Sequence, residues 1–151
     1  MTVAVRRRRG SDLDAATLYA LLALRMEVFV VEQSCPYLEL DGRDLDPTTR
    51  HYWLESDGVE VISTLRLLEE CSEDTAVFRI GRVCTRADRR GHGHSGRLME
   101  AALSEVGDRT CRLSAQTYLT GMYARRGFSP DGPEFLDEGI AHVPMVREAS
   151  R

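Results

Sequence analysis

The hydrophobic and polar positions of this chain follow two periods, one typical of helices and one typical of strands. Near the N-terminus the apolar residues repeat at helical spacing, which predicts a helix that begins at a cap at Ser11 or Asp12 and runs to about Val30. Arg25 lies on the apolar face of this helix, where an arginine usually pairs with a carboxylate in the interior or in a cleft. The rest of that face consists of Leu18, Leu21, Leu22 and Phe29.

Alternating and continuous apolar segments predict the strands of an α/β chain. Residues 51–55 and 59–67 are expected to form a hairpin, with the turn residues Ser56, Asp57 and Gly58 between them. Further strands are predicted at residues 3–5, 77–85, 111–115 and 140–147. Along the chain these strands alternate with helical segments.

The remaining segments are predicted as one short helix and two loops. The helix covers residues 117–126 and ends at Gly127. Polar residues 69–75 are expected to form a loop. Residues 32–50 are acidic and irregular, and their unusual length marks them as a candidate binding loop.

A glycine-rich segment joins the strand at 77–85 to a second amphipathic helix. The glycines are Gly91, Gly93 and Gly96, and the helical pattern that follows them ends at Gly107. A strand, a glycine-rich turn and a helix start present unpaired backbone N–H groups and the positive end of a helix dipole, so this segment predicts a site for a phosphate group. A solvated turn without a ligand is the alternative.

Three known phosphate loops compete for this segment. The glycine spacing matches the dinucleotide fingerprint, but the strand at 111–115 does not end in the acidic residue that this fingerprint requires. A P-loop needs lysine and then serine or threonine after its last glycine, and Arg97 and Leu98 stand there instead. The third pattern is the acetyltransferase loop R/Q-x-x-G-x-G/A, in which Arg90 and Gly93 fit and Ser95 replaces the last small residue.

Composition narrows the class of protein. The 151 residues are predicted to form one domain over residues 1–151, and the net charge of −4 argues against a nucleic-acid partner. No apolar run is long enough to span a bilayer or to act as a signal peptide, so a cytoplasmic protein without membrane contact is expected. The four cysteines lack C-x-x-C spacing and are expected to be reduced thiols. All twenty basic residues are arginine, so no lysine can act as a base.

A second motif lies after the glycine-rich loop. Tyr123-Ala124-Arg125-Arg126-Gly127-Phe128 is similar to the F-Y-x-x-x-G-F ending of the GNAT superfamily of N-acetyltransferases, with Met122 in place of the first Phe. The chain resembles the ElaA-like subfamily in further segments: residues 24–33, 35–37, 39–46, 80–83 and 137–142. The resemblance extends from about residue 18 to residue 147.

This resemblance implies a GNAT fold, in which a mixed, mostly antiparallel central sheet is splayed between its fourth and fifth strands and flanked by about four helices. It also implies that acetyl-CoA lies in the V-shaped opening of the sheet. The residues expected to bind it are Val83, Cys84, Thr85, Arg90, Gly91, His92, Gly93, His94, Ser95, Gly96 and Gln116. No cysteine or acidic residue completes a metal site with His92 and His94, so no metal is expected.

The implied reaction moves an acetyl group directly from acetyl-CoA to a primary amine. Tyr123 matches the general acid that protonates the leaving thiolate. The general base stays open, because Cys111 stands where many relatives have a glutamate. The candidate bases are Glu32 and His142, with Asp41, Asp44, Glu138 and His51 as further candidates. Residues expected on the acceptor side are Arg25, Asp41, Asp44, His51 and Glu138.

The acidic residues between 32 and 46 suggest a wall of the acceptor cleft that attracts a cationic amine. The acceptor itself, a small-molecule or peptide amine, is not identified by the sequence, and a homodimer is compatible with it. Two other functions stay open: an acyltransferase that uses another acyl-CoA or an acyl carrier, such as an acyl-homoserine lactone synthase-like enzyme, and a non-catalytic regulatory module that binds CoA.

Overall fold

The computed structural model describes residues 2–73 and 75–149, and within them the chain forms an eight-stranded sheet. The strand order is β1-β2-β3-β4-β5-β8-β6, and β7 pairs with β8. All pairings are antiparallel except the parallel pair β4–β5, so the predicted mixed, mostly antiparallel fold is confirmed. The strands are β1 (Val3–Arg9), β2 (Arg50–Ser56), β3 (Glu60–Ser72), β4 (Thr75–Thr85), β5 (Cys111–Gln116), β6 (Ser129–Pro130), β7 (Phe135–Asp137) and β8 (Ile140–Arg147).

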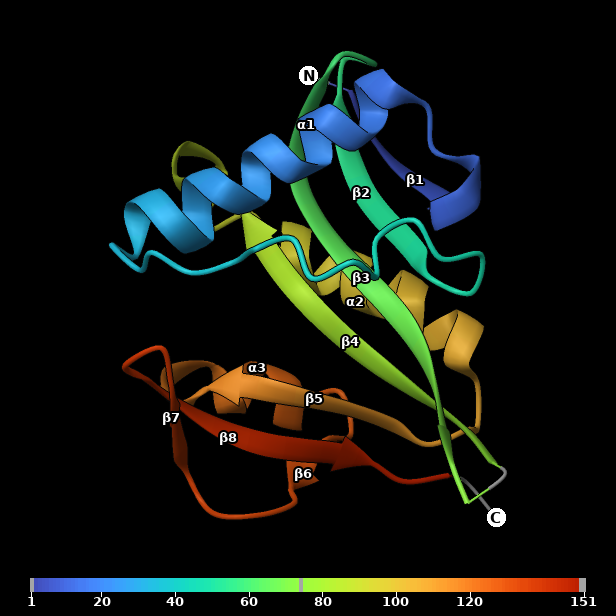
Figure 1. Ribbon diagram of the computed structural model, residues 1–151, viewed down its shortest axis with the longest axis vertical. Coiled ribbons are helices and arrows are strands. Elements are labelled where there is room, and N and C mark those ends of the chain that lie inside the picture. The colour runs from blue at the N-terminus through green and yellow to red at the C-terminus, as the bar shows by residue number, and fades with distance from the viewer. Residues whose placement is uncertain (1, 74, 150–151) are drawn as a thin grey trace.

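The feature that shapes the functional site is the short contact between β4 and β5. These strands pair only at Phe78–Cys111 and Arg79–Arg112. Beyond this point they diverge, and Figure 1 shows β5 and β8 leaving β4 at an angle that opens toward the carboxyl ends of both strands. The predicted splay between the fourth and fifth strands is therefore confirmed.

Three α-helices accompany the sheet in the described part of the chain: α1 (Ala15–Met26), α2 (His94–Val106) and α3 (Thr120–Ala124). About four helices were expected, and the helix predicted at 117–126 is shorter than expected, since a 3₁₀ turn at Thr117–Leu119 precedes α3. Figure 1 shows α1 and α2 on opposite faces of the sheet. No helix among the described residues is both long and apolar enough to cross a membrane.

The first helix begins later than predicted. Its cap is Asp14, whose side chain accepts a hydrogen bond from the backbone N–H of Thr17 at 2.7 Å. Gly10–Asp12 forms a separate 3₁₀ turn, in which Gly10 is buried against the backbone of Asp44 and Asp46 with no room for a Cβ. After Met26 the helix widens into a π-helical segment, Glu27–Glu32, which leads into the long loop at 33–49.

The hairpins are partly as predicted. The turn at Asp57 and Gly58, both with positive φ, joins β2 to β3 as expected. The predicted loop at 69–75 is wrong, because β3 and β4 continue through most of it and pair as far as Ser72–Thr75. The core lies between the sheet and α2, which buries Leu98, Met99, Ala102, Leu103 and Val106 against residues such as Phe78 and Leu113.

Candidate active site

A cleft of about 760 Å³ occupies the opening between β4 and β5. Its walls come from the π-helical segment and the loop after it, from β4, from the glycine-rich loop, and from the β7–β8 turn. Most of the sequence-predicted site residues line it: Glu32, Asp41, Val83, Cys84, Thr85, Arg90, Gly91, Gly93, His94, Ser95, Gly96, Gln116, Tyr123, Glu138 and His142. Arg25, Asp44, His51 and His92 do not.

The glycine-rich loop forms one end of the cleft and leaves its backbone open. Gly91 and Gly93 have φ values of 84° and 75°, which residues with a Cβ rarely adopt, and a Cβ at either position would meet nothing within 4 Å. Gly93 caps α2 without a side-chain hydrogen bond, so the first N–H groups of the helix have no side-chain acceptor. Such a loop favours an anionic group, because its open N–H groups and the helix dipole both attract negative charge.

Hydroxyl groups hold this helix start against the sheet. The Thr85 hydroxyl lies 2.7 Å from Ser95 Oγ and 2.8 Å from Ser63 Oγ, and Ser63 also donates to the carbonyl of Cys84 at 3.0 Å. The loop is therefore fixed relative to the end of β4. Arg90 adds a further contact, since its Nε donates to the Thr85 carbonyl at 3.0 Å.

Arg90 also determines the surroundings of Glu32. Its two terminal nitrogens donate to the two carboxylate oxygens of Glu32 at 2.7 and 2.9 Å. The predicted base candidate Glu32 is thus committed to an ion pair at the phosphate end of the cleft. Cys111, at the position where many relatives have a glutamate, is buried in the core, where burial raises the pKa of its thiol to about 12.

A bulge interrupts β4 in the middle of the cleft. Thr64 pairs with Cys84 and Arg66 with Gly81, so Arg82 and Val83 together oppose a single residue of β3. Arg82 has a φ of 53°, in the left-handed region. From Gly81 onward β4 has no pairing with β5, so its backbone groups on that side are open to the cleft. Arg82 is not among the site residues predicted from the sequence, because no local pattern distinguishes it from an ordinary strand residue.

Tyr123 lies on α3 and borders the cleft. Only 5% of the residue is exposed, and its ring packs edge-on against Phe128, with centroids 6.3 Å apart. Its hydroxyl has no hydrogen-bond partner among the described residues. Burial raises the pKa of Tyr123 to about 12, so the hydroxyl keeps its proton at neutral pH. The same effect raises the pKa of Cys84 to about 12, which leaves that thiol protonated as well.

Comparison with known proteins agrees with this geometry. The family model described as an acetyltransferase (GNAT) domain matches residues 23–149. The chain belongs to the GNAT family. A UPF0039 protein of Mycobacterium tuberculosis is 63% identical over 150 residues, which cover 99% of this chain and 96% of that protein. Escherichia coli ElaA is 37% identical over 142 residues, covering 91% of this chain and 92% of ElaA. The chain is therefore similar to ElaA, as the sequence motifs indicated.

Solved structures show the same relation. The crystal structure of ElaA superposes with a TM-score of 0.87 at 34% identity, covering 97% of this chain and 100% of ElaA. A Pseudomonas aeruginosa acyl-CoA N-acyltransferase gives a TM-score of 0.89 at 39% identity, covering 97% of this chain and 99% of that protein. GNAT enzymes use acyl-CoA, and the fold supports acyl-CoA-dependent acyl transfer.

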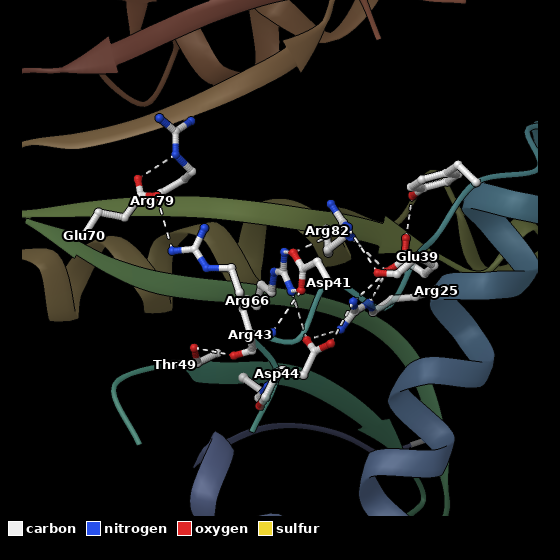
Figure 2. A network of polar contacts seen from close by, with 12 residues as sticks. Arg25, Glu39, Asp41, Arg43, Asp44, Thr49, Arg66, Glu70, Arg79 and Arg82 are labelled. Atoms are coloured by element: carbon white, nitrogen blue, oxygen red, sulfur yellow. Dashed lines mark hydrogen bonds and ion pairs between the residues drawn. The ribbon is translucent and has the colours of Figure 1, made fainter. Parts of the chain in front are cut away.

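The predicted acidic wall of this GNAT domain is neutralised by arginines from other elements (Figure 2). Arg25, only 1% exposed, bonds Glu39 at 2.7 Å and Asp44 at 2.6 Å. Arg66 bonds Asp44 and Asp41, and Arg82 bonds Glu39 at 2.8 Å. These arginines lie outside the acidic segment, so the charge of that segment alone does not predict the net charge of the wall. The expected attraction for a cationic amine therefore does not follow from the acidic residues.

Three residues expected on the acceptor side lie beneath the cleft rather than in it. Arg25 and Asp44 pair with each other in the interior and fasten the 33–49 loop to α1 and β3. His51 is buried, with Nε2 2.8 Å from the Asp44 carbonyl oxygen. Burial lowers the pKa of His51, so the imidazole stays neutral near pH 7. Their positions make them supports of the cleft wall.

The wall on the opposite side of the cleft carries acidic groups. Asp137 and Glu138 lie at the β7–β8 turn, both exposed, and neither side chain has an ion pair within residues 2–73 and 75–149. His142 lies beside them, with Nδ1 2.8 Å from the Ile140 carbonyl and its ring stacked on Phe135. Its Nε2 therefore remains available to the cleft.

No group of three metal-ligating side chains lies together in the described part of the chain.

The open phosphate loop leads to a first prediction. Gly93→Asp would place a side chain and a negative charge on a left-handed residue where an anion is expected. We expect acetyl-CoA affinity, measured by calorimetry, to fall more than roughly tenfold, with an unchanged circular dichroism spectrum. If the variant binds acetyl-CoA as tightly as the unmodified protein, the assignment of the pyrophosphate to this loop is wrong.

Proposed function

We propose that this GNAT protein is an N-acetyltransferase that moves an acetyl group from acetyl-CoA directly to a primary amine. The observation that carries the proposal is the cleft itself. An open phosphate loop, an unpaired strand edge and the Tyr123 hydroxyl lie along one continuous cavity. This order matches what a long thioester cosubstrate requires from its anionic end to its reactive end.

The chain offers binding groups for the pyrophosphate, the pantetheine arm and the thioester of acetyl-CoA. The backbone of Gly91 to Gly96 would hold the pyrophosphate, and the open edge of β4 at Val83 to Thr85 would pair with the pantetheine arm. Gln116, at the end of β5, would bond the same arm from the opposite wall. Bound acetyl-CoA supplies an activated thioester carbonyl. A backbone N–H at the β4 bulge would stabilise the oxyanion that forms there.

We assign the two proton transfers of the reaction to different residues. Tyr123 would donate its hydroxyl proton to the departing sulfur, which its raised pKa permits because the group is protonated at working pH. His142 Nε2 and the Glu138 carboxylate, on β8 and in the turn before it, would take the proton of the amine, directly or through water. The Glu32 carboxylate is the weaker candidate because Arg90 occupies both its oxygens. Direct transfer then needs no covalent enzyme intermediate.

We propose a cytoplasmic setting, which the thiols support. Cys35, Cys71, Cys84 and Cys111 are free, and no two of them are joined. Such cysteines suit a reducing compartment, so we place the reaction in the cytoplasm.

The test is a turnover assay with a panel of amines and with acetyl-, butyryl- and octanoyl-CoA. We expect CoA release and an N-acetylated product, with acetyl-CoA the preferred donor. A preference for the octanoyl donor would favour an enzyme similar to acyl-homoserine lactone synthases. Tight acetyl-CoA binding without product from any amine would favour a regulatory module that only binds CoA.

A further inference from the structure

A row of arginines lies along the floor of the cleft and directly beneath it. Figure 2 shows side chains from β3, β4 and the 33–49 loop on one face of the sheet, arginines alternating with carboxylates. The arginines are Arg25, Arg43, Arg66, Arg79 and Arg82, and the carboxylates bonded to them are Glu39, Asp41, Asp44 and Glu70. Five guanidinium groups face four carboxylates, so the row carries one positive charge that is not matched within it.

The unmatched charge lies at the Arg79 end of the row. Arg79 Nε donates to one oxygen of Glu70 at 2.8 Å, and Arg43 takes the other oxygen at 3.2 Å. The two terminal nitrogens of Arg79 have no hydrogen-bond partner among the described residues. Figure 2 shows them pointing away from Glu70 toward the strands across the opening. The side chain is 35% exposed and lines the cleft, so these donors are accessible to a ligand.

A second donor group faces the same space. Arg82 uses Nε and one terminal nitrogen on Glu39, and its other terminal nitrogen has no partner in the described part of the chain. Between Arg79 and Arg82 stands Gly81, where an added Cβ would meet nothing within 4 Å. The floor between the two guanidinium groups is therefore open. Guanidinium donors around an open floor are suited to a planar oxyanion.

We propose that the acceptor is an amine that also carries a carboxylate, and that Arg79, assisted by Arg82, binds this carboxylate. This inference rests on the proposed function, because it names the substrate class of the same cleft. The single unmatched charge favours a monoanion over a phosphate dianion. A free amino acid and the carboxyl end of a short peptide share this chemistry.

The experiment measures binding rather than turnover. Protein saturated with CoA is titrated by calorimetry with L-amino acids and with their carboxamides, which differ only in the negative charge. Dipeptides and their amides distinguish a peptide source, and spermidine and phosphoethanolamine represent a polycation and a phosphate. We expect the carboxylate members to bind roughly tenfold tighter than their amides, the effect of a charge-assisted pair of hydrogen bonds.

Arg79→Gln should remove this preference without unfolding the chain, because a partly exposed ion pair near the surface contributes little to stability. Arg79→Lys, which keeps the charge but not the paired donors, should retain part of it. Arg112→Gln is the matched control, since Arg112 pairs with Asp131 outside the cleft, and it should bind like the unmodified protein. Loss of the preference in the control as well would overturn the assignment to Arg79.

Equal binding of acids and amides, tighter binding of spermidine or phosphoethanolamine, or an unchanged preference in Arg79→Gln would each overturn the inference. The results also distinguish a failure of the proposed transferase function from a failure of the carboxylate site. Carboxylates that bind through Arg79 but are never acetylated would contradict the transferase and support the carboxylate site. Rapid acetylation of amides and polyamines without regard to charge would support the transferase and overturn the site.

Discussion

Replacement of Tyr123 by phenylalanine is expected to lower kcat roughly ten- to a thousandfold, the range that positioned proton donation contributes to a reaction. The change removes only a hydroxyl that has no hydrogen-bond partner among the described residues. The ring would keep its contact with Phe128, so the fold and the acetyl-CoA affinity should be unchanged. The measurement is steady-state kinetics with calorimetric acetyl-CoA binding on the same preparation.

The pH dependence makes this test stricter. Because burial raises the pKa of Tyr123 to about 12, the hydroxyl stays protonated across the working range. The factor lost in Tyr123→Phe should therefore be the same at pH 7 as at pH 9. Tyr19→Phe is the control, since Tyr19 is 78% exposed on α1 and away from the cleft. Turnover equal to that of the unmodified protein in Tyr123→Phe would mean that the thiolate leaves without this acid.

The second large effect is expected on stability. Asp44→Asn should lower the free energy of unfolding by about 3 kcal/mol, because it removes the carboxylate shared by buried Arg25 and Arg66 and leaves each with a single partner, Glu39 or Asp41. Asp44 receives hydrogen bonds from Arg25 at 2.6 Å and from Arg66 at 3.1 Å. Asp46→Asn, two residues on, is the control and should stay within about 0.5 kcal/mol, since its side chain is exposed. Urea unfolding followed by circular dichroism measures both.

The same difference should depend on pH in one direction. Burial opposes the charge on Asp44, but the bonds and charges of Arg25 and Arg66 outweigh it and lower the pKa of the carboxyl. A carboxyl with a lowered pKa stabilises the fold fully above its unfolded value and loses that contribution as pH falls through the folded value. The gap between Asp44→Asn and the unmodified protein should hold at pH 7 and shrink only below about pH 4. An unchanged gap at low pH would mean that charge does not cause the destabilisation.

The sequence predicted those parts of the molecule whose signals are local. The Asp57-Gly58 turn, the glycine-rich loop and the helix after it depend on residues that are neighbours in the chain. The strands at 69–75 were missed because charged Glu69 and Glu70 read as a loop. In the structure Arg50 and Arg79 pair with them and permit the hairpin to continue.

The acceptor side of the cleft was the least predictable part. The acidic segment around Asp41 looked uncompensated because its partners, Arg66 and Arg82, come from strands more than twenty positions away. Arg82 has its unusual conformation because of a bulge that depends on pairing with β3. Contacts of this kind arise only when the sheet assembles, and a hydrophobic pattern does not record them.

The brief contact between β4 and β5 also bears on self-association. A strand with unpaired N–H and C=O groups usually lies at the rim of a sheet, where it can recruit a foreign polypeptide and start aggregation. Here such a strand edge is enclosed in a crease that opens from a single strand spacing at Phe78 and Arg79. A strand of another protein is attached to the rest of its fold, which is too bulky to enter this narrow opening. A thin unbranched molecule can enter it. The fold can thus keep a reactive strand edge permanently available without exposing it to other proteins.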